Sequence, residues 1–200
     1  MDGFSNHAYM WSLTTRQITM LSIVAALCIG IQLTPRPPNV EFTALIVFLV
    51  GAIFGIPIAT GLGALVMFIN GFFSPWGFAG LMMPFQMIGM AIIGVGGGLY
   101  RRKRESSYDI SSCIETAILG AFFTLVYDVI TNFGVAVSYV LVGMPILLAF
   151  INTIISGALF SLIHIVSNTT VFALIFFPLS NALQKLLGGE NTWKKGPSPT

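Results

Sequence analysis

The chain has 200 residues, of which 56% are hydrophobic and only 8% are charged. Its mean hydropathy of +0.89 is far above that of a soluble domain, in which roughly a quarter of the residues are charged. This composition excludes a soluble domain and predicts an integral membrane protein, so the formal net charge of +2 reflects residues that flank the membrane and does not indicate a nucleic-acid surface.

Long uncharged intervals separated by short polar joints predict several membrane-spanning helices of about 20 residues each. After a cytoplasmic segment at residues 1–17, the first helix is expected over residues 18–33. It ends in a proline-rich stretch at residues 34–41, because proline cannot continue a helix. The second and third helices are expected over residues 42–54 and 58–73, and the loop that follows carries Trp76, a residue type that suits the membrane interface.

The second half of the chain is predicted in the same way. The fourth helix is expected over residues 81–100, before a basic run at 101–104, and the fifth over residues 114–142. The next stretch, 146–187, is too long for one ordinary span and too short for two spans with a loop, so we expect a short buried or interfacial helix over 146–158 and a sixth span over 159–183. The sequence thus predicts an all-α integral membrane protein with six transmembrane helices in one domain, residues 18–187, followed by a flexible cytoplasmic tail, residues 188–200.

The basic residues predict the orientation of this arrangement. Most of them fall on one side: Arg16, the basic run at 101–104, Lys185, Lys194 and Lys195, with Arg36 alone on the other. Because cytoplasmic loops carry an excess of Lys and Arg, we expect both termini in the cytoplasm.

One charged residue, Asp128, interrupts the apolar stretch between Glu115 and Lys185. An ionisable side chain inside the membrane is costly and by default marks a functional site. Asn132 follows it by four residues and therefore shares its helix face. His164 and Asn168 have the same spacing on the sixth span. A structural hydrogen bond is the alternative role for Asp128, and an interhelical hydrogen bond is the alternative for His164.

Polar residues of other spans are expected at the same depth, in the outer half of the bundle. Such a convergence predicts an outward-opening small-molecule pocket with mostly apolar walls. Its candidate substrate-binding residues are Asp128, Asn132, His164, Asn168, Gln86, Asn70 and Trp76. The amide side chains could equally serve as interhelical hydrogen bonds. We expect no cofactor and no metal, because one of the only two histidines lies in the polar N-terminal segment.

A ladder of small residues, Ser22, Ala26 and Gly30, lies on the first span. Small residues four apart let a second helix approach closely, either in the same chain or in another subunit. The spacing alone favours packing within this chain.

The order of several segments resembles that of the substrate-binding S components of energy-coupling factor (ECF) transporters, over about residues 16–187. The segments that carry the resemblance are Pro38-Asn-Val-Glu41, Gly51-Ala-Ile-Phe-Gly55, Phe72-Phe-Ser-Pro-Trp-Gly77, Pro84-Phe-Gln-Met87, Tyr127-Asp-Val-Ile-Thr-Asn132 and Leu162-Ile-His-Ile-Val-Ser-Asn168.

This resemblance implies a multi-pass protein of the prokaryotic plasma membrane. Such a protein captures a vitamin or related micronutrient from outside and delivers it by docking to a transmembrane T protein with two cytoplasmic ATPases. The resemblance assigns docking to Ser22, Ala26 and Gly30, and a lid function to the loop with Arg36, Asn39 and Glu41. It implies that the chain is not itself an enzyme, which agrees with the lack of a Walker A lysine.

Two other classes of function stay open at this stage. A secondary transporter working alone would use Asp128 and His164 as a proton relay, and its uptake would be sensitive to proton uncouplers. An intramembrane enzyme would use the same pair as acid and base, but the sequence supplies it with neither an evident nucleophile nor a metal site. Riboflavin, thiamine, pantothenate, folate, cobalamin and their precursors are all possible ligands of an S component.

Overall fold

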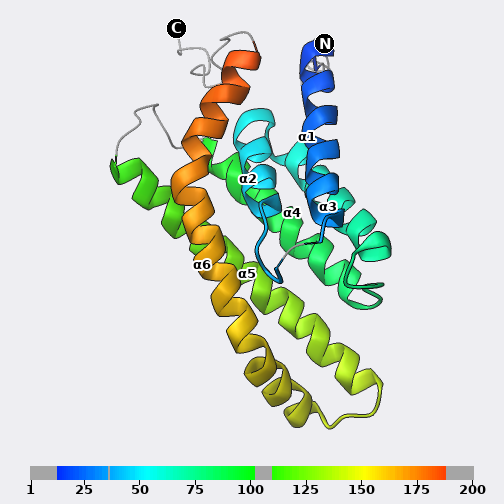
Figure 1. The fold of residues 1–200 in the computed structure, drawn as a ribbon. Helices are drawn as coiled ribbons and strands as arrows, with labels where there is room; N and C mark the ends of the chain where they lie inside the picture. Colours follow the sequence, from blue (N-terminus) through cyan, green and yellow to red (C-terminus); the bar gives the residue numbers. More distant parts are fainter. Residues whose placement is uncertain (1–12, 36, 102–109, 188–200) are drawn as a thin grey trace, which may run out of the picture.

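The computed structural model describes residues 13–35, 37–101 and 110–187, with the backbone alone at residue 101. These ranges contain no strand and six helices: α1 (Thr15–Leu33), α2 (Thr43–Phe54), α3 (Ile56–Phe73), α4 (Met82–Arg101), α5 (Ile110–Leu141) and α6 (Ile146–Leu186) (Figure 1). The expected all-helical membrane fold is confirmed, since every helix except α2 is long and apolar enough to cross a bilayer.

The short helix α2 forms the core of the bundle. Every residue from Thr43 to Ile53 is buried, and α2 contacts each of the other five helices. The Phe48 ring packs against the rings of Phe172, at 5.4 Å between centroids, and Tyr100, at 5.7 Å. With 12 residues, α2 is about 18 Å long, so it is surrounded by protein and does not span the hydrocarbon by itself.

Helices α2 and α4 approach each other through glycine. A Cβ atom at Gly97 would overlap the backbone carbonyl of Phe48, and one at Gly51 would overlap the carbonyl of Gly94. Backbones that meet at this distance leave no room for any side chain, so α4 is fixed directly against the core helix.

Helices α5 and α6 form a long antiparallel hairpin whose turn contains Gly143, at a φ of 98°. The predicted separation of residues 146–158 from a sixth span is wrong, because α6 continues without a break over 41 residues. Residues 146–177 contain no proline, and Gly157 fits against the side chain of Asn132. A helix of about 60 Å exceeds the hydrocarbon thickness of about 30 Å, which long helices accommodate by tilting.

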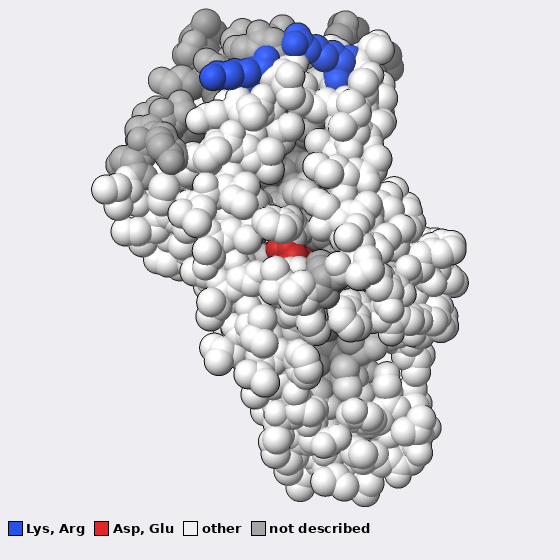
Figure 2. Space-filling model, in the orientation of Figure 1, with Lys and Arg blue, Asp and Glu red and all other residues white. Residues whose placement is uncertain are grey.

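The start of α1 and the end of α6 lie at the same end of the molecule, and the α5–α6 hairpin extends beyond the other helices at the opposite end (Figure 1). Figure 2 shows Lys and Arg side chains at the first end and a small acidic patch further along the face. Of the basic residues used to predict the orientation, Arg16 and Lys185 have described side chains. Arg36, Lys194, Lys195 and residues 102–104 of the basic run lie outside the described residues.

Candidate functional site

Three buried ionisable side chains meet in the middle of the bundle. His164 on α6 places Nδ1 at 2.6 Å from Oδ1 of Asp128 on α5, and Nε2 at 3.4 Å from Oε1 of Glu41 in the α1–α2 loop. Asp128 and Glu41 are each 7% exposed and His164 is 4% exposed. A carboxylate only accepts hydrogen bonds, so two ionised carboxylates require an N–H from both ring nitrogens. In that state an imidazolium lies between the two carboxylates.

Gln32 holds Glu41 from the other side. Its amide nitrogen donates to Oε2 of Glu41 at 2.7 Å and to Oγ1 of Thr43 at 2.6 Å. The side chain is 2% exposed, so its hydrogen bonds to Glu41 and Thr43 are protected from water. Our sequence analysis missed Gln32, although a polar residue in the last turn of an apolar helix was a usable signal.

The proline-rich loop is tied to α6 at a second point. Asn39 has a φ of 59°, a left-handed conformation that Asn tolerates better than most residues, and its Nδ2 donates to the carbonyl of Phe160 at 2.8 Å. Together with the contact between Glu41 and His164, this bond closes the loop over the α5–α6 hairpin. Arg36, the third residue that we expected in this lid, lies outside the described residues.

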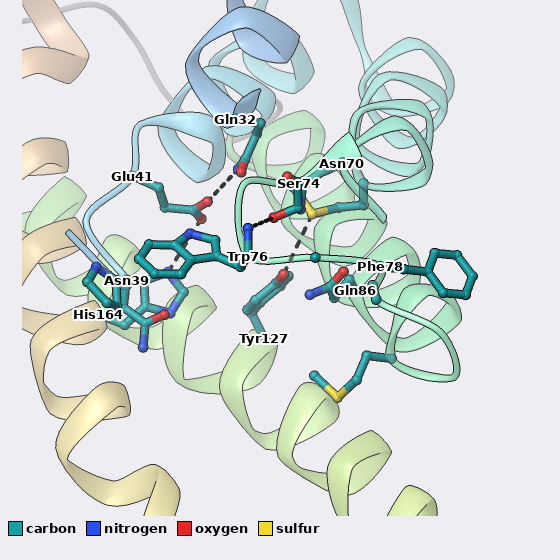
Figure 3. Close-up of a pocket in the computed structure, with 15 residues that line it drawn as sticks. Gln32, Asn39, Glu41, Asn70, Ser74, Trp76, Phe78, Gln86, Tyr127 and His164 are labelled. Carbon is teal, nitrogen blue, oxygen red and sulfur yellow. Dashed lines mark hydrogen bonds and ion pairs between the residues drawn. The ribbon is translucent and has the colours of Figure 1, made fainter. Parts of the chain in front are cut away.

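Two adjoining cavities surround the ionisable cluster. The first has a volume of about 390 Å³ and lies towards α1, α3 and the α3–α4 loop (Figure 3). The second has about 340 Å³ and lies between α4, α5 and α6. Both are within the size range of small-molecule sites. They share five lining residues, Asn39, Met82, Gln86, Tyr127 and His164, so we describe them as two compartments of one site.

The structure brings together all of the predicted substrate-binding residues except one. Asn70 and Trp76 line the first compartment, Asp128 and Asn132 line the second, and Gln86 and His164 line both. Asn168 lines neither, because it lies one turn beyond His164 on α6.

The aromatic side chains Trp76, Phe78 and Tyr127 form part of the wall of the first compartment. Tyr127 packs its ring edge-on to His164, with 5.7 Å between centroids, and directs its hydroxyl to the sulfur of Met67 at 3.6 Å. Trp76 is 63% exposed, and Figure 3 shows its indole at the rim of the cavity, on the side of Asn39 and Glu41. An exposed indole at the mouth of a cavity offers a flat surface for a planar ligand.

The second compartment is lined by hydroxyl groups that our sequence analysis did not identify: Thr131, Thr153, Ser156 and Ser161. Three of them donate to the carbonyl one turn earlier in their own helix, as Thr131 does to Tyr127 and Ser156 does to Asn152. Hydroxyls commonly make this bond in any helix, so their presence in a span gives no signal of a cavity. Within the described residues, no group of three or more His, Cys, Asp or Glu side chains is arranged to hold a metal ion.

The family profile described as ECF-type riboflavin transporter, S component, matches residues 12–185. The chain belongs to this family. Comparisons with curated proteins and with solved structures found no match. The resemblance seen in the sequence is therefore confirmed over nearly the whole helical bundle.

As an ECF S component, the chain is a substrate-binding subunit of a membrane transporter and not an enzyme. The two compartments around Glu41, Asp128 and His164 lie within the residues that the profile matches.

Proposed function

We propose that this S component binds riboflavin from the outer side of a prokaryotic plasma membrane and delivers it by docking to a T protein with two ATPases. The family description names riboflavin, and the site offers the matching chemistry. Riboflavin is uncharged, with a planar ring system at one end and a polyhydroxylated chain at the other. The aromatic rim with Trp76 and Tyr127 suits the ring system, and the carboxylates and hydroxyls deeper in the site suit the chain.

The cluster of Glu41, His164 and Asp128 is the observation that carries this proposal. It supplies carboxylate acceptors to a ligand with many hydroxyl donors, and charge-assisted hydrogen bonds are the stronger kind. The described lining of both compartments contains no Lys or Arg. A ligand with a carboxylate or phosphate would therefore bring further negative charge next to two acids, which low dielectric makes costly. Neutral riboflavin is favoured over anionic vitamins and over phosphorylated flavin.

Features outside the site support delivery to a partner. Ser22, Ala26 and Gly30 are all exposed on α1, which packs only against α2 and α3 among the described helices. A second helix could approach this face closely. The α1–α2 loop would open and reclose over the substrate, since its described contacts with α6 are the hydrogen bond of Asn39 and the contact of Glu41.

The proposal is tested by titrating riboflavin into the detergent-purified full chain and following flavin fluorescence, which falls when the ring stacks on an aromatic side chain. We expect saturable quenching by riboflavin, and binding of the phosphorylated flavin that is weaker by roughly a hundredfold, about 2.7 kcal/mol. The double variant Asp128→Ala, Asn132→Ala serves as the site-damaged control. Absence of saturable binding of riboflavin, with another vitamin retained through purification and identified by mass spectrometry, would replace riboflavin by that vitamin.

The 2.6 Å contact between His164 and Asp128 also favours a second candidate, a proton-coupled transporter working alone. Uptake into vesicles that contain only this chain and a proton gradient would support that candidate. Uptake that requires the T protein, ATPases and ATP would exclude it.

A further inference from the structure

Gln86 on α4 lies at the junction of the two compartments and lines both of them. Its amide oxygen Oε1 is buried and has no hydrogen-bond partner. Among the described residues that line the first compartment, Gln86 is the only one with a buried and unpaired side-chain atom. Buried polar atoms almost always have a partner, so this amide indicates a ligand group that satisfies it.

Contacts of α4 with its two neighbours fix the position of this side chain. One turn after Gln86, Gly89 receives the ring of Tyr127 from α5, since a Cβ atom there would lie 2.7 Å from that ring. One turn before Gln86, the side chain of Met83 packs against Gly71 on α3. Residues three apart share a helix face, so Gln86 faces the space between α3 and α5. Figure 3 shows its side chain there, near Tyr127, among the residues that line the first compartment.

The ring system of riboflavin has one polar edge that matches an amide. Its imide group carries an N–H donor at N3, with the carbonyl oxygens of C2 and C4 on either side, whereas the opposite edge is a dimethyl-substituted benzene ring. A carboxamide holds one acceptor and one donor group in a plane, so it can pair with the N–H and a neighbouring carbonyl at once. An imide edge that is buried without such partners weakens binding.

The junction between the compartments selects this edge of the ring. The sugar chain of riboflavin leaves the ring at N10, on the same side as the C2 carbonyl. With the ring in the first compartment and the chain in the second, the chain-bearing side of the ring lies at the junction. Of the residues shared by both compartments, Met82 is apolar and suits the benzene half, while Asn39 and His164 have partners on α6 and α5. Gln86 offers the open amide.

We infer that Gln86 determines specificity for the flavin ring, with Oε1 accepting a hydrogen bond from N3–H and Nε2 donating to the C2 carbonyl oxygen. The inference rests on the proposed binding of riboflavin and extends it to one edge of the ring. A site built to pair with an N–H rejects an analogue that lacks it, because the acceptor of the site is then left unpaired. Flavins modified at N3 are therefore rejected, and flavins without the sugar chain keep this interaction.

The test titrates three flavins into the detergent-purified full chain and follows flavin fluorescence. They are riboflavin, N3-methylriboflavin, in which a methyl group replaces the imide hydrogen, and lumiflavin, in which a methyl group replaces the sugar chain. We expect N3-methylriboflavin to bind the natural protein roughly 10- to 100-fold more weakly than riboflavin. Gln86→Leu should weaken riboflavin and lumiflavin by the same factor, and should reduce the discrimination against N3-methylriboflavin to about threefold or less.

Gln184→Leu is the matched control, because Gln184 on α6 is also partly buried but lines neither compartment. Its affinities for all three flavins should stay within about twofold of the natural protein. If Gln86→Leu fails to fold, Gln86→Met replaces it, since methionine is unbranched and adapts to the space. The comparison of riboflavin with N3-methylriboflavin needs no variant at all.

Two results would overturn the inference while riboflavin remains the substrate. One is equal affinity of the natural protein for riboflavin and N3-methylriboflavin. The other is a loss of riboflavin affinity in Gln86→Leu with no loss of lumiflavin affinity, which would assign Gln86 to the sugar chain. Absence of riboflavin binding to the natural protein would instead overturn the riboflavin proposal, and this inference with it.

Discussion

Glu41 enters the bundle from a loop, yet it is as buried as Asp128 in the middle of a long helix. A carboxylate in such a position needs partners, and it finds them in the amide of Gln32 and the imidazole of His164. Proline stops α1 before this residue, and the loop then turns at Asn39 and directs the acid inwards. Closing the loop and completing the ionisable cluster are therefore the same structural event.

At this residue we predict that Glu41→Gln weakens riboflavin binding by roughly 10- to 100-fold, the range expected for loss of a hydrogen bond to a charged group. Glutamine keeps the shape of the side chain but replaces one acceptor oxygen by a donor. Either Gln32 or His164 then faces another N–H. The measurement is the flavin fluorescence titration.

Glu115→Gln is the matched control, since Glu115 is exposed near the start of α5 and lines neither compartment. Its affinity should stay within about twofold of the natural protein. Unchanged affinity in Glu41→Gln would instead assign Glu41 a purely structural role.

At the scale of elements, a hydrogen bond from Asn39 to the carbonyl of Phe160 ties the α1–α2 loop to α6. Asn39→Gly keeps the left-handed backbone available while removing the side chain, which makes it a cleaner change than alanine. We expect riboflavin to dissociate about fivefold faster, for a bond worth about 1 kcal/mol, with little change in the association rate. Stopped-flow flavin fluorescence measures both rates.

Asn39→Asp is the companion variant, because aspartate also tolerates this backbone but cannot donate when it is ionised. It should release riboflavin at least as fast as Asn39→Gly. Equal dissociation rates for all three proteins would show that the loop does not retain the substrate.

The contact of α2 with α4 gives a prediction about stability. Gly97→Ala forces a methyl group into the backbone of Phe48, and overpacking of this kind costs roughly 1–3 kcal/mol or more. Gly30→Ala is the control, because a Cβ at Gly30 would meet nothing within 4 Å. Thermal unfolding in detergent should show a clearly lower midpoint for Gly97→Ala and no loss for Gly30→Ala. Equal unfolding midpoints for Gly97→Ala and Gly30→Ala would mean that α2 and α4 can move apart at little cost in stability.

At the scale of the whole molecule, hydropathy and proline positions predicted where helices α1 to α5 lie, because apolar length and helix breakers are local signals. They failed for α6, because a criterion based on bilayer thickness divides a stretch of 41 residues that the chain folds as one helix. The spacing of Asp128, Asn132 and His164 predicted much of the site for the same local reason.

The rest of the site depends on contacts between distant segments, which a single sequence does not contain. The position of Gln32 in an apolar helix was a sequence signal, but its hydrogen bond to Glu41 forms only when the loop returns Glu41 to the end of α1. Three of the four serines and threonines that line the second compartment form hydrogen bonds inside their own helices, so their role as wall residues appears only with the packing of α5 on α6.

Assembly with partner subunits depends on the exposed face of α1. Helices that associate through small residues tolerate large ones poorly, so Ala26→Leu should block the close approach of a T-protein helix. Ala26 lines neither compartment, so riboflavin binding should not change. We expect co-purification with a co-expressed T protein and ATPases to fall by roughly tenfold or more.

Ala158→Leu makes the same substitution at an exposed position of α6 and should leave assembly intact. Loss of assembly in Ala158→Leu but not in Ala26→Leu would move the docking surface to the α5–α6 hairpin. Riboflavin binding and co-purification are both measured on Ala26→Leu and on Ala158→Leu. A variant that binds riboflavin normally but fails to assemble shows that docking and substrate capture use different surfaces of this protein.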